Sequence, residues 1–287
     1  MAPSACTESG PPLKMMPVGA FAAISAAVGA SFAGMLGVCS TSGPGFILKQ
    51  EALNLAVVAE LPLVVANIQR AGPSTGMPTK NEQADLLMAL YGRSSDSPLP
   101  VLAPSTPGDC FWIMLEAFHI AVRYMTPVVV LSDSFLANSA EPWLVPDVEA
   151  LPRYPVRLCE EPAGFAPYRR DAQTLARPWA VPGTPGLEHR VGGLEKEDGS
   201  GSVSYSPENH ERMTRLRHEK VARVALELPP AEVNGAERGS LLVVGWGGTH
   251  GAITSAVDEA RAEGLDVSSL HLRYLNPFPA KIGRAHV

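Results

Sequence analysis

Short apolar runs alternate with helical patterns through the first half of the chain. The runs are uncharged and rich in β-branched residues, as buried parallel strands are, and they cover residues 34–40, 63–69, 100–103 and 127–132. The helical patterns between them cover residues 19–34, 46–60, 80–92 and 107–124. Strands and helices that alternate at this spacing predict an α/β fold with a doubly wound parallel sheet.

Beyond residue 139 this alternation stops. Prolines are frequent from Pro142 to Pro185, and because proline interrupts helices and sheets we expect few long elements there. Helical periodicity returns over residues 209–228. We therefore interpret residues 140–238 as a proline-rich connector with one helix. It lies either over a partner chain or on the surface as an insertion without a partner.

A second, smaller α/β unit is predicted after the connector. Its expected elements are a strand at 240–244, a glycine-rich turn at 245–251, a helix at 252–263 and a strand at 267–272. The turn has the spacing G-x-G-x-x-x-G, and no acidic residue ends the following strand. Both features depart from the dinucleotide-binding pattern, so we do not expect a dinucleotide there.

The loop that follows the strand at 63–69 contains the strongest candidate chemistry. Arg70 stands where the strand ends, and small residues, hydroxyls and two prolines follow it up to Lys80. In an open α/β sheet, ligands bind at the edge where the strands end. Arg70 can bind a carboxylate there, with neutral hydrogen bonds added by Ser74, Thr75 and Thr79. The alternative is a structural loop whose arginine pairs with a carboxylate of the same chain.

A second turn at a strand end has the sequence Thr41-Ser42-Gly43-Pro44-Gly45. Its two glycines allow close approach of the backbone to a ligand, and the start of the following helix offers backbone N–H donors. Any tight turn from a strand to a helix can use the same residues. The motif alone therefore leaves its role open.

Residues 67–80, Asn-Ile-Gln-Arg-Ala-Gly-Pro-Ser-Thr-Gly-Met-Pro-Thr-Lys, resemble the signature of the α chain of 2-oxoacid:ferredoxin oxidoreductases, most closely the 2-oxoglutarate type. Weaker matches extend from about residue 19 to Pro279. The resemblance implies a thiamine diphosphate enzyme that oxidatively decarboxylates a 2-oxoacid to an acyl-CoA and reduces ferredoxin. It identifies residues 19–139 as a pyrimidine-binding domain that is incomplete at its start. It also identifies residues 239–280 as a truncated domain like the carboxy-terminal domain of transketolase.

The same resemblance assigns roles at the site. Arg70 binds the substrate carboxylate, and the lesser candidates for the same pocket are Thr75, Thr79 and Lys80. The turn formed by Thr41, Ser42, Gly43, Pro44 and Gly45 contacts the cofactor. In this family the active site lies between two chains. The β subunit holds magnesium, the diphosphate and a [4Fe–4S] cluster, the α chain covers the pyrimidine and the substrate, and CoA is the co-substrate.

No catalytic residue is identified. The family's glutamate, which protonates the aminopyrimidine of the cofactor, is matched here by Ala20. We therefore expect the chain alone to be inactive. Residues 1–18 give no structural signal, and residues 281–287 look like a translated sequencing adapter, which favours the alternative of a non-catalytic or truncated fragment. A further alternative is another thiamine diphosphate enzyme, such as a transketolase-like dehydrogenase component.

Composition and charge argue against several classes of protein. A net charge of −6 and a pI near 5.7 argue against a nucleic-acid surface and indicate a soluble, cytoplasmic protein. The uncharged stretch 15–48 is dominated by Ala, Gly and Ser, with few Leu and Ile. We therefore interpret it as containing a buried helix, not a membrane span or a signal peptide.

The cysteines and histidines do not indicate a metal site. The four cysteines are far apart and form no C-x-x-C pair, which argues against a cluster, a zinc site or a disulfide framework in this chain. Cys39 and Cys110 lie in apolar stretches and are expected in the core. His189, His210 and His218 are not spaced as metal ligands, and we expect them at the surface or as capping residues.

Overall fold

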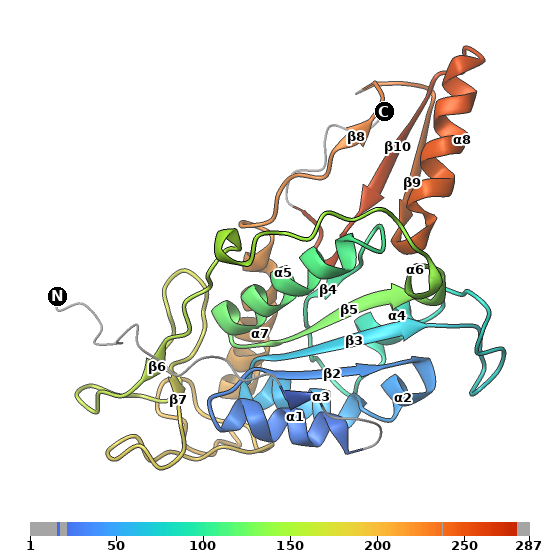
Figure 1. Ribbon diagram of the computed structural model, residues 1–287. Coiled ribbons are helices and arrows are strands. Elements are labelled where there is room, and N and C mark those ends of the chain that lie inside the picture. The colour runs from blue at the N-terminus through green and yellow to red at the C-terminus, as the bar shows by residue number, and fades with distance from the viewer. Residues whose placement is uncertain (1–15, 18–21, 237, 280–287) are drawn as a thin grey trace.

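The computed structural model describes residues 16–17, 22–236 and 238–279. Within these residues a six-stranded sheet forms the centre of the molecule, in the order β1-β2-β3-β5-β4-β11 (Figure 1). Its strands are β1 Met16–Pro17, β2 Gly37–Thr41, β3 Leu63–Gln69, β4 Val101–Leu102, β5 Pro127–Asp133 and β11 Tyr274–Asn276. All neighbours pair in parallel except β11, which is antiparallel to β4. The predicted α/β fold with a parallel sheet is confirmed.

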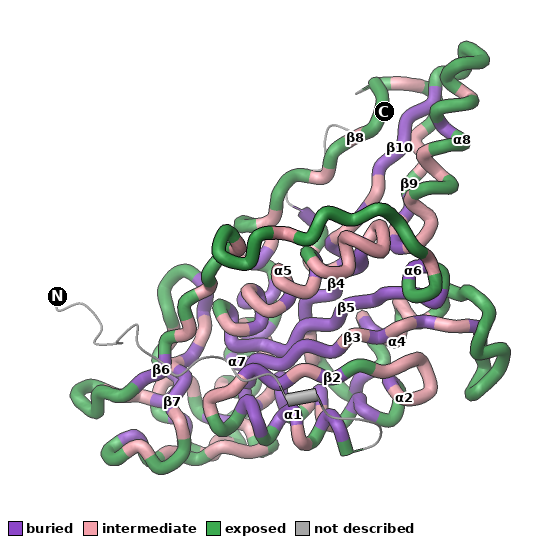
Figure 2. The backbone as a smooth tube through the Cα atoms, viewed as in Figure 1, coloured by how far each residue is buried: buried purple, intermediate pink, exposed green. Residues whose placement is uncertain are grey.

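Helices cover both faces of this sheet. One face packs against α1 Ala23–Phe32 and α3 Gln50–Ala59, and the other packs against α5 Asp109–Tyr124, which α7 Pro207–Val224 flanks. Along β5, Val129 belongs to the first apolar cluster and Val130 to the second. The strands are therefore buried on both sides, as the purple tube in Figure 2 shows, and this is why their sequences are continuously apolar.

The prediction of a single helix over residues 46–60 is wrong, because the structure has two helices there. α2 Gly43–Ile47 starts inside the predicted turn, and α3 starts again at Gln50. Lys49 lies between them, and its ammonium group turns back to donate to the carbonyl oxygen of Gly45 at 3.2 Å and to Thr41 Oγ1 at 3.3 Å. The break in the helix thus coincides with a contact to the preceding turn.

The helix predicted over residues 80–92 is also too long. α4 covers only Leu86–Tyr91, and the polar residues before it are not helical. Gln83 donates to Asp133 at 3.0 Å, and the Asp85 carboxylate accepts from Asn67 at 2.8 Å. The polar residues that resemble a helix start are instead used in contacts with the strands of the sheet.

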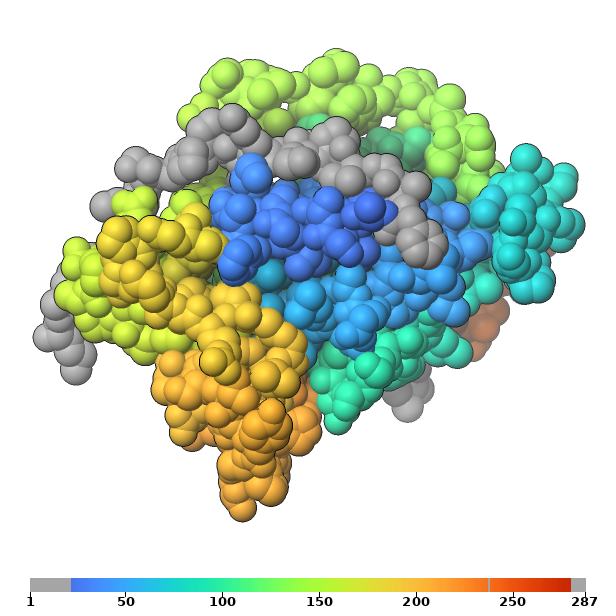
Figure 3. All heavy atoms as spheres, turned by 90° about the horizontal axis from the view of Figure 1, so that it is seen from below, coloured from blue at the N-terminus to red at the C-terminus, as the bar shows by residue number. Residues whose placement is uncertain are grey.

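The connector is an integral part of this domain. After the short helix α6 Ser134–Asn138 and the 3-10 turn η1 Val148–Ala150, it forms a small parallel pair of strands, β6 Leu158–Cys159 and β7 Trp179–Ala180. The Trp179 indole donates to the carbonyl oxygen of Ser31 in α1 at 3.0 Å, and Figure 3 shows the yellow connector segment against the blue α1 region. The connector is therefore packed against the domain, and whether it is a surface insertion without a partner stays an open alternative. A position over a partner chain stays a prediction.

The second α/β unit stands at one end of the large sheet (Figure 1). Its elements are β8 Val233–Asn234, β9 Leu241–Trp246, the 3-10 turn η2 Gly247–Thr249, α8 His250–Ala262 and β10 Val267–Leu272. β9 and β10 are parallel, and β8 is antiparallel to β10. After β10 the chain returns to the large sheet as β11. The chain that leaves the second unit therefore adds an edge strand to the large sheet.

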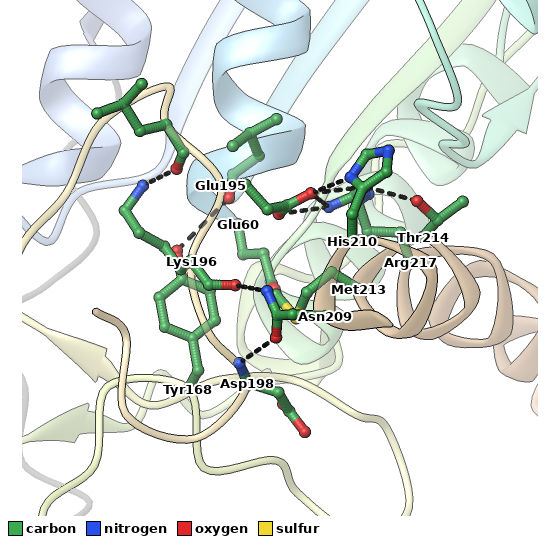
Figure 4. Close-up of polar contacts among 12 residues, drawn as sticks. Glu60, Tyr168, Glu195, Lys196, Asp198, Asn209, His210, Met213, Thr214 and Arg217 are labelled. Carbon is green, nitrogen blue, oxygen red and sulfur yellow. Dashed lines mark hydrogen bonds and ion pairs between the residues drawn. The ribbon is translucent and has the colours of Figure 1, made fainter. Parts of the chain in front are cut away.

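A buried ion cluster fastens the connector and α7 to this domain. Glu60 ends α3 in a left-handed conformation with φ of 51°, and only 2% of its surface is exposed. Its carboxylate accepts from Arg170 Nη1 at 2.5 and 2.6 Å and from the ammonium group of Lys220 in α7. Beside it, Asn209 donates to the carbonyl oxygen of Lys196 at 2.9 Å (Figure 4).

Burial of Glu60 would by itself raise the pKa of its carboxyl group, but Lys220 and Arg170 lower that pKa to about 2, from an ordinary value of 4.5. Because the folded pKa is lower than the unfolded one, the charged carboxylate stabilises the fold. This contribution is complete above the unfolded pKa of about 4.5, and it is lost as the pH falls through the folded value of about 2.

We expect Glu60→Gln to lower the free energy of unfolding by about 3–5 kcal/mol at neutral pH, because it leaves two buried cations without their counter-ion. Urea unfolding of both proteins should give a difference that is large near neutral pH and shrinks from about pH 5 towards pH 3. Glu149→Gln is the control, since it removes an exposed pair with Arg153 worth at most about 1 kcal/mol. A difference that does not change with pH would contradict this role.

Candidate functional site

Three strands of the large sheet end side by side. In the parallel register Thr41 of β2 lies opposite Asn67 of β3, and Gln69 of β3 lies opposite Asp133 of β5. The turns that follow these strands therefore meet at one edge of the sheet. This is the edge at which open α/β sheets bind ligands.

Arg70 follows the last residue of β3 at this edge. The residue is half-buried, and its Nε atom is buried without a hydrogen-bond partner. Among the described residues, no carboxylate forms an ion pair with its guanidinium group. The interpretation of Arg70 as one half of a structural ion pair is therefore wrong for the described part of the chain. A guanidinium group that lacks a partner can bind an anionic ligand.

The other loop candidates, Thr75, Thr79 and Lys80, are exposed (Figure 2). The loop closes on itself. The Ala71 N–H donates to the carbonyl oxygen of Lys80 at 2.9 Å, and the carbonyl oxygen of Ala71 accepts from the Met77 N–H at 3.1 Å. None of the three candidate side chains hydrogen-bonds to Arg70 or to any other described residue. The structure thus leaves these three side chains exposed and does not join them to Arg70 by hydrogen bonds.

The Thr41–Gly45 turn is packed tightly. A Cβ atom at Gly45 would lie 2.3 Å from Thr41 Oγ1 and 3.4 Å from Lys49 Nζ, so only glycine fits that position without displacing them. Lys49 itself is 5% exposed and has no carboxylate partner among the described residues. Sequence reasoning missed Lys49 because it stands inside an apparently continuous helical pattern.

Asn67 connects this turn to the chain beyond Arg70. Its side chain is fully buried, its Nδ2 donates to Asp85, and its Oδ1 has no partner among the described atoms. The Asp85 carboxylate also packs against the turn, since a Cβ at Gly43 would lie 2.9 Å from it. Sequence reasoning did not select Asn67, although an amide in an otherwise apolar strand is a usable signal.

Asp133, at the end of β5, fastens the second unit to the same edge. Its Oδ1 accepts from Leu136 N–H at 3.0 Å and caps α6, and its Oδ2 accepts from Gly248 N–H at 2.9 Å. A Cβ at Gly248 would lie 2.8 Å from this carboxylate. Contact with Asp133 therefore accounts for the glycine at 248, and no bound dinucleotide is needed to explain it.

The remaining sequence candidates lie away from this edge. His210 and His218 are exposed as predicted, and His210 Nδ1 is 2.9 Å from Glu195 Oε2. His189 is instead half-buried, with Nδ1 2.7 Å from the carbonyl oxygen of Leu187. Ala20 and residues 281–287 lie outside the described residues, as do nearly all of residues 1–18.

Cys39 is buried, and burial raises the pKa of its thiol although Lys49 opposes this. Burial also raises the pKa of the half-buried Cys110. Neither thiol is prepared for nucleophilic chemistry. In the described part of the chain, no three His, Cys, Asp or Glu side chains are grouped as metal ligands. Of the described helices, none is both long enough and apolar enough to cross a bilayer.

Comparison with known proteins identifies relatives. The chain is 55% identical to 2-oxoglutarate oxidoreductase subunit KorA of Mycobacterium tuberculosis over 91% of its length and 40% of the relative's. It is 35% identical to 2-oxoglutarate synthase subunit KorA of Archaeoglobus fulgidus over 90% of its length and 66% of the relative's. The solved 2-oxoglutarate:ferredoxin oxidoreductase from Magnetococcus marinus superimposes with a TM-score of 0.85 at 36% identity, over 90% of this chain and 45% of that one.

The chain thus spans between two fifths and two thirds of the lengths of these relatives. Its residues 19–206 match the family described as pyruvate flavodoxin/ferredoxin oxidoreductase, thiamine diphosphate-binding. This range contains the Thr41–Gly45 turn, Arg70 and most of the connector. The chain therefore belongs to the thiamine diphosphate-binding family of pyruvate flavodoxin/ferredoxin oxidoreductases.

Proposed function

We propose that this chain is the α subunit of a 2-oxoglutarate:ferredoxin oxidoreductase. Such an enzyme decarboxylates the 2-oxoacid, transfers the acyl group to CoA and passes the electrons to ferredoxin. The observation that carries the proposal is the guanidinium group of Arg70, which has no carboxylate partner in the described part of the chain and lies at the edge where sheets of this kind bind ligands. The names of the relatives support 2-oxoglutarate as the substrate.

The described residues at this edge fit the cofactor of the family. Asn67 Oδ1 is a buried acceptor without a donor, and the exocyclic amino group of the thiamine pyrimidine is a donor. Close packing of Thr41 and Lys49 against Gly45 gives the turn a fixed shape, and its backbone N–H groups could then contact the cofactor. When bound, thiamine diphosphate supplies the electron sink that decarboxylation requires. This chain would contribute the pyrimidine contacts and, through Arg70, the orientation of the substrate carboxylate.

Our proposal assigns the other groups to partners. The β subunit would hold magnesium, the diphosphate and a [4Fe–4S] cluster, and ferredoxin would accept the electrons in the cytoplasm. Residues 19–139 would form the pyrimidine-binding domain, residues 140–238 the connector and residues 239–280 the transketolase-like unit. Thr75, Thr79 and Lys80 are exposed here, so any part they take in substrate binding requires the partner chain to cover the loop.

We expect Arg70→Ala, in the complex with the β subunit, to raise the KM for 2-oxoglutarate. Loss of a charge-assisted pair of about 1.5–3 kcal/mol corresponds to an increase of about 10-fold to 150-fold. Reduction of ferredoxin or of a viologen dye measures the rate. Arg153→Ala, which changes an exposed arginine of the connector, should leave the KM unaltered. If Arg70→Ala also leaves it unaltered, Arg70 does not bind the substrate.

We expect Gly45→Ala to weaken thiamine diphosphate binding, because the new methyl group displaces Thr41 or Lys49. Overpacking of this kind typically costs about 1–3 kcal/mol. Isothermal titration of the complex with thiamine diphosphate and magnesium gives the affinity. Gly29→Ala is a matched control, since a Cβ there meets nothing within 4 Å. If the two variants bind thiamine diphosphate equally tightly, the Thr41–Gly45 turn takes no part in binding the cofactor.

A further inference from the structure

A cavity of about 680 Å³ lies beside the start of β5, at the edge opposite the candidate site. Its walls are the last turns of α5, the segment 154–159 and the segment 169–179. Met125, two residues before β5, belongs to the lining, whereas the candidate site lies where β5 ends at Asp133. The seven residues of β5 separate the two by about 20 Å. The cavity is therefore distinct from the proposed reaction site.

The lining of this cavity is strongly cationic. The described residues that line it include five arginines, Arg123, Arg157, Arg169, Arg170 and Arg177. Their only carboxylate neighbour in the lining is Asp171, whose Oδ1 already accepts from Thr174 N–H at 2.7 Å and Gln173 N–H at 3.0 Å. Arg123 and Arg170 have counter-ions outside the lining, in Glu227 and Glu60. The cavity thus keeps a net positive charge.

Three of these arginines have no carboxylate partner among the described residues. Arg157 makes no hydrogen bond there, and Arg169 donates only to the carbonyl oxygen of Gly164 at 2.8 Å. Arg177 is 4% exposed, and it donates to the carbonyl oxygens of Ala59 at 3.0 Å and Pro178 at 3.2 Å. Burial lowers the pKa of Arg177 although the nearby Glu60 carboxylate opposes this, so burial of this guanidinium group is still unfavourable. An anion in the cavity would remove this penalty.

We propose that this cavity binds a small molecule carrying a diphosphate or polyphosphate group. Guanidinium groups form paired hydrogen bonds with phosphate oxygens, and three arginines in the lining of one cavity match several phosphate charges. A volume of this size accommodates a ligand as large as a nucleotide. Tyr154, stacked on His119 at 4.1 Å between ring centroids, gives the cavity an aromatic wall. The inference does not depend on the proposed function.

Isothermal titration with inorganic pyrophosphate tests this inference on the protein purified with any subunits that accompany it. We expect saturable binding at one site per chain. The double substitution Arg157→Met and Arg169→Met should weaken the affinity by about tenfold or more, since each change removes a charge-assisted contact. Both side chains are exposed, so the fold should be unaffected, and thermal unfolding verifies this.

Arg153→Met is the matched control, because Arg153 is an exposed arginine of the same connector outside the cavity lining. It should bind pyrophosphate as the unaltered protein does. The inference fails if pyrophosphate does not bind saturably, if the double variant binds as tightly as the unaltered protein, or if Arg153→Met weakens binding to the same extent. Inorganic sulfate at the same concentration should compete less well, since it is a single tetrahedral anion with fewer charges and oxygens than pyrophosphate.

Discussion

The buried carboxylate of Glu60 joins three parts of the chain that are distant in sequence. It ends α3, and its two cationic partners come from the connector and from α7. Because α7 completes the apolar cluster over α5 through Val224, the ion cluster also positions the cover of one face of the sheet. A proline-rich segment with few regular elements can hold one conformation only if such contacts anchor it. Glu60 therefore determines where the connector lies and gives the arginine-lined cavity its shape.

The sequence predicted the sheet well, because buried parallel strands are recognisable by local composition. The strand at 63–69 was predicted with its observed bounds and the helix at 107–124 with its observed end, and the parallel direction of the strands followed from alternation alone. The starts of the helices near residues 43–50 and 80–86 were not predicted correctly. There Lys49, Gln83 and Asp85 have distant partners that local periodicity does not encode. Long-range hydrogen bonds decided those boundaries.

Some residues of the candidate site could be identified from the sequence, and others could not. Arg70 was found from the sequence because a cation after a buried strand is unusual and because its loop has a recognisable signature. Asn67 and Asp133 were not found, although both lie at the same edge. Their roles come from the strand register and from the glycine turn of the second unit, 115 residues after Asp133 in sequence. A single sequence read locally cannot supply either relation.

The two edges of the large sheet carry cations in different surroundings. At the strand ends, Arg70 and Lys49 are cations without carboxylate partners among the described residues, and Lys49 donates to Thr41 and Gly45. At the opposite edge, arginines of the connector surround a cavity next to the Glu60 cluster. An anion bound there would compensate charge close to the cations that hold Glu60, and so would stabilise the connector. Because β3 and β5 run from one edge to the other, such stabilisation would act on the same strands that position Arg70.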